Sequence, residues 1–195
     1  MHVEVFVEEP SAREALVQLL PKILPSEHTF EVHAFRDKQE LLREMPKRLQ
    51  AYAKWLPSDW RIVVLVDEDR EDCRALKRRL VEAAEAAHLA DRVLCRIVVE
   101  ELEAWFFGDV DALRAVYPRL PSTLHRRRAY RDPDAIAGGT WEALHRLLLA
   151  HGYAAGLVKT EAAKRIARHM DPDRNRSHSF QVFRRGLERL VQGAP

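Results

Sequence analysis

Two groups of acidic residues directly follow short apolar runs that are rich in β-branched residues. Glu8 follows the run Val5-Phe6-Val7, and Asp67 and Asp69 follow the run 62–66. A helical pattern comes after each group, so both groups are expected at the carboxyl ends of buried parallel strands, where open α/β sheets carry their active sites. Carboxylates that converge there repel one another unless a cation neutralises them. Oxygen-only ligands suit Mg²⁺ or Mn²⁺, which predicts a hard-cation site.

The acidic segment 67–72 also has a simpler interpretation. It contains five acidic residues just before a helical pattern, and acidic residues are favoured near a helix N-terminus. The position of Glu8 at the end of a second predicted strand favours the metal site, because an ionised glutamate in such a place needs a partner.

Two further segments carry groups with a potential chemical role. Glu100 and Glu103 are about one helical turn apart and are expected to share a helix face, whereas Glu101 is the one expected to face solvent. Lys159 is one of few lysines and comes just before a helical segment. It would either neutralise a phosphate or a transition-state charge, or be an ordinary surface lysine.

Strand and helix patterns alternate through the first 107 residues. This alternation predicts an α/β protein with a mostly parallel, Rossmann-like sheet and helices on both faces. The helix near residues 41–52 contains Pro46, which is expected to kink or divide it. The strands are expected at residues 2–8, 30–35, 61–66 and 93–99, and helices near residues 10–23, 41–52, 73–87 and 100–107.

Strand signals stop after Gly108. Amphipathic patterns at 141–149 and 160–170 predict helices, and a last helix begins near Phe180 with Ser177 or Ser179 as its N-cap. We therefore expect an α/β core over residues 1–107 and a C-terminal helical extension over residues 108–195, packed on the core as one structural domain.

Composition describes an ordinary globular chain, since 47% of its 195 residues are hydrophobic and 32% are charged. No apolar stretch approaches the roughly 18 residues of a membrane span. Two cysteines without framework spacing, and a first segment without a signal-peptide pattern, lead us to expect a cytoplasmic protein. A net charge of +2 does not by itself favour binding to nucleic acid. The basic segments 125–131 and 174–176 either hold phosphates or form a solvated face.

The same acidic segments resemble a known family. Residues 7–11 (VEEPS) resemble the VEG-x-[ST] element of Toprim domains, and residues 66–69 (VDED) resemble the Toprim DxD motif. Residues 100–105 (EELEAW) resemble the ELEAW signature of a stand-alone bacterial Toprim-like family of unknown function. That family is similar to the nuclease half of the overcoming-lysogenisation-defect (OLD) proteins. The resemblance extends over the full length and includes Lys159 and residues 175–180.

This resemblance implies a Mg²⁺- or Mn²⁺-dependent nuclease that cleaves phosphodiester bonds in nucleic acid, with DNA and RNA equally open. It also implies a role in phage defence or repair beside a separately encoded ATPase, and it leaves a homodimer open. Its implied metal ligands are Glu8, Asp67 and Asp69. A second ion or its water is assigned to Glu103 and Glu100, and stabilisation of transition-state charge to Lys159.

Two positions depart from the Toprim pattern. Glu9 stands where Toprim domains usually have glycine, and Ala12 stands where relatives often carry a second acid. Both departures would weaken or shift metal binding and favour a non-catalytic partner subunit that keeps the fold. A receiver-like phosphoacceptor module is a further alternative, although receivers need a lysine after a fifth strand and the sequence shows no such strand.

Overall fold

A four-stranded parallel sheet forms the centre of the computed structural model, which describes residues 1–69, 71–153 and 158–193. The strand order is β2-β1-β3-β4, and all three pairings are parallel. This arrangement confirms the predicted α/β class. The strands are β1 (His2–Val7), β2 (Thr29–Ala34), β3 (Trp60–Asp67) and β4 (Val93–Val98).

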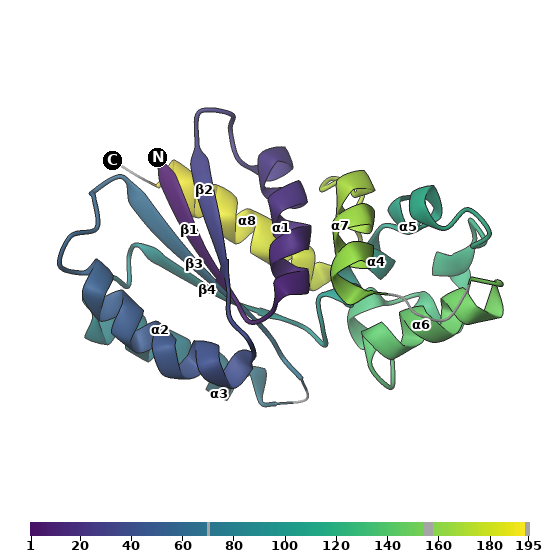
Figure 1. The fold of residues 1–195 in the computed structure, drawn as a ribbon, viewed down its shortest axis with the longest axis horizontal. Helices are drawn as coiled ribbons and strands as arrows, with labels where there is room; N and C mark the ends of the chain where they lie inside the picture. Colours follow the sequence, from purple (N-terminus) through teal and green to yellow (C-terminus); the bar gives the residue numbers. More distant parts are fainter. Residues whose placement is uncertain (70, 154–157, 194–195) are drawn as a thin grey trace.

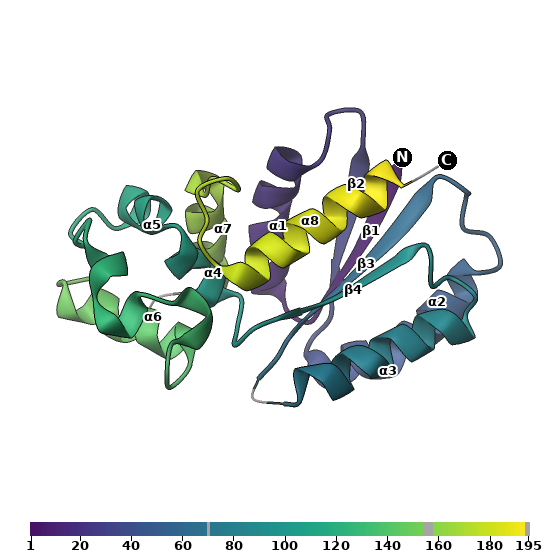
Figure 2. The same ribbon diagram turned by 180° about the vertical axis from the view of Figure 1, so that it is seen from behind.

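Both faces of the sheet are covered by helices (Figures 1 and 2). Side chains alternate between the faces along a strand, so that Val3 and Val5 join one apolar core while Phe6 joins the other. β3 is buried at every residue from 61 to 67, which explains its continuous apolar sequence. One face carries α1 (Pro10–Ile23) and α8 (His178–Gln192), and the other carries α2 (Lys38–Tyr52) and α3 (Cys73–Ala86).

The remaining helices gather beyond the carboxyl ends of the strands, on the right in Figure 1. These helices lie next to the carboxyl edge of the sheet, where the acidic residues follow the strands. Within this arrangement α7 packs against α1. Whether the chain divides at residue 107 stays a prediction. The helices of this group are α4 (Glu103–Gly108), α5 (Val110–Val116), α6 (Thr140–Ala150) and α7 (Lys159–His169), with short 3-10 turns at Leu124–Arg126, Arg128–Tyr130 and Pro133–Ala135.

Local details of the helices test two expectations. Ser177 is the N-cap of α8, and its Oγ accepts a hydrogen bond from the Phe180 N–H at 3.1 Å, as predicted. Pro46, expected to kink or divide its helix, does not divide it, because α2 continues from Lys38 to Tyr52, and a kink stays a prediction. Leu41, Met45 and Leu49 bury one side of α2 against the sheet, and this packing outweighs the hydrogen bond that the proline cannot donate.

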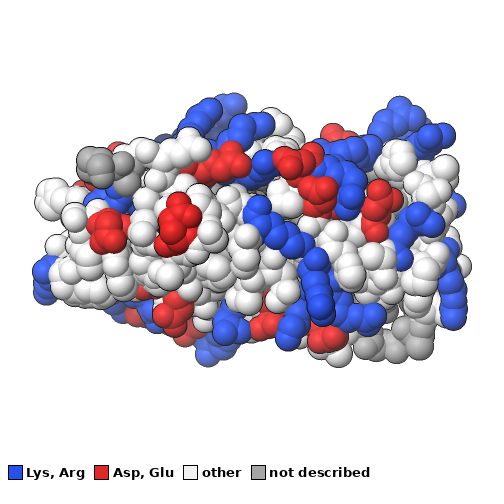
Figure 3. Space-filling view, turned by 90° about the horizontal axis from the view of Figure 1, so that it is seen from above, with Lys and Arg blue, Asp and Glu red and all other residues white. Residues whose placement is uncertain are grey.

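The molecular surface has mixed charge. On the face seen in Figure 3, Lys and Arg side chains alternate with Asp and Glu side chains, with uncharged surface between them. Among the described helices, none is both long and apolar enough to cross a membrane.

Candidate metal centre

Adjacent parallel strands bring the first two carboxylates together. Val7 of β1 pairs with Leu65 of β3, so the chain leaves both strands at the same edge of the sheet. The backbone N–H of Asp67 donates a hydrogen bond to Oε2 of Glu8 at 3.2 Å. One carboxylate oxygen from each of Glu8, Asp67 and Asp69 lies within 4.8 Å of the other two. The structure thus brings together the three residues that the sequence assigned to a metal.

A backbone turn directs Asp69 to this point. Its φ of 49° lies in the left-handed region, which aspartate tolerates better than most residues. The side chain of Asp69 is 45% exposed, whereas Asp67 and Glu8 are buried. Asp69 lines two depressions, one of about 540 Å³ that also includes Glu8, and one of about 260 Å³ that also includes Glu100. The cluster therefore has a buried base and is open to solvent at Asp69.

The charges of the buried carboxylates are poorly neutralised. Burial raises the pKa of Glu8 to about 7, and the neighbouring charge of Asp69 adds to this shift. Burial, and then the charges of Glu8 and Glu103, raise the pKa of Asp67 well above its usual range. A divalent cation would remove both penalties, because its charge favours the ionised form of every carboxylate that it contacts.

Glu103 is the least satisfied carboxylate in this region. It is the first residue of α4 and is fully buried. Neither of its carboxylate oxygens has a hydrogen-bond partner within the described residues. Burial raises the pKa of Glu103 to about 7, although the Lys159 ammonium, 3.8 Å from Oε1, opposes the shift. Buried polar atoms without partners are rare, and at this position a bound cation would satisfy them.

Lys159 reaches the acidic edge from the start of α7. Its Nζ lies 2.8 Å from Oε1 of Glu9 and 5.9 Å from the centre of the Trp141 ring. Burial lowers the pKa of Lys159, but the carboxylates of Glu103 and Glu9 outweigh burial and raise it, so the ammonium is charged. Glu9, the residue that departs from the Toprim pattern, thus holds this lysine against the site.

Lys38 is a neighbour of the site that the sequence analysis missed. It is the first residue of α2, and its Nζ lies 2.9 Å from Oδ2 of Asp69 and 3.4 Å from Oε1 of Glu71. A lysine in the first turn of a helix opposes the helix dipole, which is a weak signal for nearby acids. The contact itself depends on the strand order, because β2 lies beside β1.

The geometry around Glu100 differs from the expectation. α4 begins at Glu103, and Glu100 precedes it with a φ of 63°, so the prediction that both glutamates share a helix face is wrong. Glu101 does not simply face solvent either. Its Oε2 accepts hydrogen bonds from Thr140 Oγ1 and the Trp141 N–H, both at 2.9 Å, and so caps α6. The left-handed backbone at Glu100 lies before the helix, which therefore begins at Glu103. Metal binding by Glu100 stays a prediction.

Comparison with known proteins gives one assignment. No curated protein and no solved structure matches this chain. One family model matches residues 7–188, a range that includes the acidic cluster, Glu103 and Lys159. The match extends over nearly the whole chain, and the chain therefore belongs to the family described as Domain of unknown function (DUF4276).

Proposed function

We propose that this protein is a divalent-metal-dependent nuclease of Toprim type. The observation that carries the proposal is the convergence of Glu8, Asp67 and Asp69, with oxygens within 4.8 Å of one another at the carboxyl edge of a parallel sheet. An acidic cluster at this edge is where an open α/β sheet places its chemistry.

The donor set fits Mg²⁺ or Mn²⁺, since all three side chains offer carboxylate oxygens. A bound ion would supply Lewis-acid chemistry, polarising a phosphoryl oxygen and lowering the pKa of an attacking water. Glu8 and Asp67 hold fixed positions because they are buried at strand ends, whereas Asp69 is open to an incoming phosphate.

Residues beside the cluster support the same chemistry. The two unpartnered oxygens of Glu103 favour a second cation or its bound water, and Glu100 lines the adjoining depression. The ammonium of Lys159 stabilises negative charge that develops on the transferred phosphoryl group. A cation of this kind has most effect in a site that excludes water, and the side chain of Lys159 is partly buried, with 29% of its surface exposed.

The resemblance of residues 7–11, 66–69 and 100–105 to Toprim and OLD proteins favours phosphodiester bonds as the substrate class. By the same resemblance we propose a nucleic-acid substrate, DNA or RNA, and a cytoplasmic role in phage defence or repair. A separately encoded ATPase as partner and a homodimer belong to the same proposal.

A cleavage assay with matched variants tests this function. Wild-type protein, alone and with a candidate ATPase from the same operon, is incubated with labelled single-stranded DNA, duplex DNA and RNA in Mg²⁺, Mn²⁺ or EDTA. We expect metal-dependent cleavage that Asp67→Ala abolishes and that Asp91→Asn retains. Asp91 is an exposed acid in the loop before β4, at the opposite edge of the sheet, and controls for contaminating nuclease. Lys159→Ala should lower the rate by about 10²–10³.

Equal activity of wild type and Asp67→Ala, from identical preparations, would contradict the nuclease. One observation favours a second candidate, a metal-binding subunit without catalysis: Glu9 engages Lys159 at 2.8 Å and so competes with a phosphate for this cation. That candidate predicts metal binding without turnover, and it predicts that Glu9→Gly does not increase cleavage. A receiver-like module has less support, because the lysines near the cluster come from α2 and α7 and the described residues form four strands.

A further inference from the structure

A second group of potential metal ligands lies on β1 and β2, away from the acidic edge. Glu4 of β1 pairs with Glu31 of β2, and Phe6 pairs with His33, so these side chains share the face of the sheet that α2 covers. His2 lies two residues before Glu4 and points to the same face. The group therefore combines two carboxylates with two imidazoles.

The ligand atoms of three of these residues converge, and His2 approaches one of the three, Glu4. One atom from each of Glu4, Glu31 and His33 lies within 4.8 Å of the other two, and Nε2 of His33 contacts Oε2 of Glu4. Nε2 of His2 lies 3.3 Å from Oε1 of Glu4. Four-coordinate Zn²⁺ with bonds of 2.0–2.2 Å requires ligand atoms about 3.3–3.5 Å apart. The separation between His2 and Glu4 already matches this requirement.

Burial places the carboxylate of Glu4 where a cation would stabilise its charge. Glu4 is 5% exposed, and among the described residues its ion-pair partners are the imidazoles of His2 and His33, while the Tyr52 hydroxyl donates a hydrogen bond to its carboxylate. A buried carboxylate is costly unless its charge is compensated. Nε2 of His2 is itself buried and has no hydrogen-bond partner among the described residues. Two observations, one on the acid and one on the base, thus point to the same place.

The second nitrogen of His2 is arranged as in metal-binding histidines. Nδ1 lies 2.8 Å from Oγ1 of Thr29. When Nδ1–H donates to this hydroxyl, the lone pair of Nε2 is free and directed toward Glu4. Such an outer hydrogen bond fixes the tautomer and orientation of histidines that bind metals.

We propose that Glu4, His33, His2 and Glu31 form a zinc site that joins the edge strand β2 to β1. Imidazole nitrogens with carboxylates suit Zn²⁺, whereas the oxygen-only cluster at the carboxyl edge suits Mg²⁺ or Mn²⁺. Glu4 precedes Glu8 by four residues of extended chain, about 13 Å, so the two sites are separate. The site is structural and does not depend on the proposed nuclease.

Metal titration tests this site directly. The protein is prepared without an affinity tag, in the Asp67→Asn background to weaken the acidic edge, and titrated with Zn²⁺ by calorimetry and with Co²⁺ by absorption. We expect one Zn²⁺ per chain, a tetrahedral Co²⁺ spectrum and a zinc-dependent rise in Tm. His33→Gln should weaken Zn²⁺ binding by more than about 100-fold, since losing a ligand costs more than losing an outer partner. His169→Gln, at the exposed end of α7, should bind as before.

The variant Glu31→Gln keeps the test decisive if His33→Gln fails to fold, because Glu31 is exposed and its substitution is tolerated. It should weaken Zn²⁺ binding and lower the intensity of the Co²⁺ bands. Absence of zinc binding in the parent protein would overturn the site, as would equal binding by the parent and both ligand variants. Either result would leave the group as a hydrogen-bonded pair of glutamate and histidine.

Discussion

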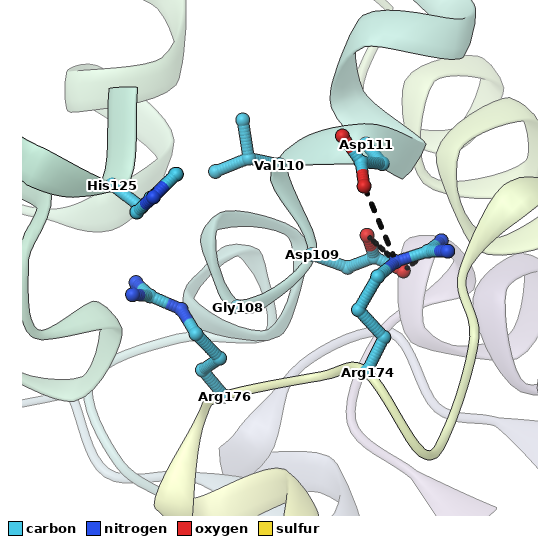
Figure 4. A pocket seen from close by; sticks show the side chains of 7 residues that line it. All are labelled: Gly108, Asp109, Val110, Asp111, His125, Arg174 and Arg176. Carbon is cyan, nitrogen blue, oxygen red and sulfur yellow. Dashed lines mark hydrogen bonds and ion pairs between the residues drawn. The ribbon is translucent and has the colours of Figure 1, made fainter. Parts of the chain in front are cut away.

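Two buried carboxylates at opposite ends of α4 have very different surroundings. Asp109, directly after α4, is 1% exposed and accepts hydrogen bonds from Nε and Nη2 of Arg174, both at 2.9 Å. It also accepts the N–H groups of Ala112 and Asp171. Figure 4 shows this pair at the side of a cavity of about 140 Å³. Glu103, at the start of α4, is equally buried, but its oxygens have no hydrogen-bond partner among the described residues.

This difference separates an acid whose partners the chain itself supplies from one whose oxygens have no hydrogen-bond partner among the described residues. The partners of Asp109 come from the chain itself, so its charge holds α5 and the segment before α8 in place. Glu103 and Asp67 lie in a region where negative charges outnumber the nearby lysines, and their pKa values are raised. Strongly raised pKa values of this kind cluster at functional sites, which supports the proposed metal site.

The largest expected effect of a single substitution is on the stability that Asp109 provides. Asp109→Ala should lower the free energy of unfolding by about 3–4 kcal/mol, since Arg174 and two backbone N–H groups lose their acceptor. Glu103→Gln, its matched variant at the other end of the helix, should cause no loss in metal-free protein. Urea unfolding at pH 8 in EDTA measures both. The comparison would fail if the glutamine variant were destabilised as much as the alanine variant.

The second prediction concerns pH. The pKa values of Glu8 and Glu103 are about 7 in the folded protein against 4.5 for an ordinary glutamate, so between these values the folded state binds protons that the unfolded state has released. Metal-free stability should therefore fall as the pH rises from 5 to 8, by on the order of 3 kcal/mol for each such carboxyl. Urea unfolding across this range should show a smaller slope for Glu103→Gln. A stability that rises with pH in wild type, with the same slope in the variant, would refute the raised pKa values.

The third prediction concerns the metal. At a Mn²⁺ concentration of about 100 times Kd, wild-type protein should gain about 2.7 kcal/mol. Asp67→Asn should lose this gain while its metal-free form is at least as stable as wild type, because one of the repelling charges is gone. Thermal unfolding with and without Mn²⁺ measures both quantities, and Asp91→Asn is the control. A strong loss of metal-free stability in Asp67→Asn would show instead that Asp67 is a structural acid like Asp109.

The contrast also explains what the sequence can predict. The apolar run before Asp67 specifies a strand buried on both faces, and parallel strands place Glu8 and Asp67 at one edge, so that convergence followed from local patterns. The partners of these residues could not be predicted from local patterns. Lys38 and Lys159 reach the cluster from distant helices, and no local pattern indicates that Asp109 pairs with Arg174, 65 residues away. The left-handed turn at Glu100 could not be predicted either, because it depends on the path of the chain from β4 to α4.

The smallest expected effect concerns Lys38. Its ammonium, 2.9 Å from Asp69, occupies the position of a competing cation. Lys38→Gln should tighten Mn²⁺ binding by about two- to fivefold, which corresponds to the value of a partly exposed ion pair. Calorimetric titration of the variant beside wild type measures the change. Weaker binding in the variant would show that Lys38 orders Asp69 for the metal and does not compete with it.

Mn²⁺ soaked into crystals of the wild-type protein, followed by anomalous diffraction, tests the central claim most directly. The account predicts a peak about 2.0–2.6 Å from oxygens of Glu8, Asp67 and Asp69, and none beside Asp109. Density for Mn²⁺ elsewhere on the molecule, with no peak between these three carboxylates, would contradict it.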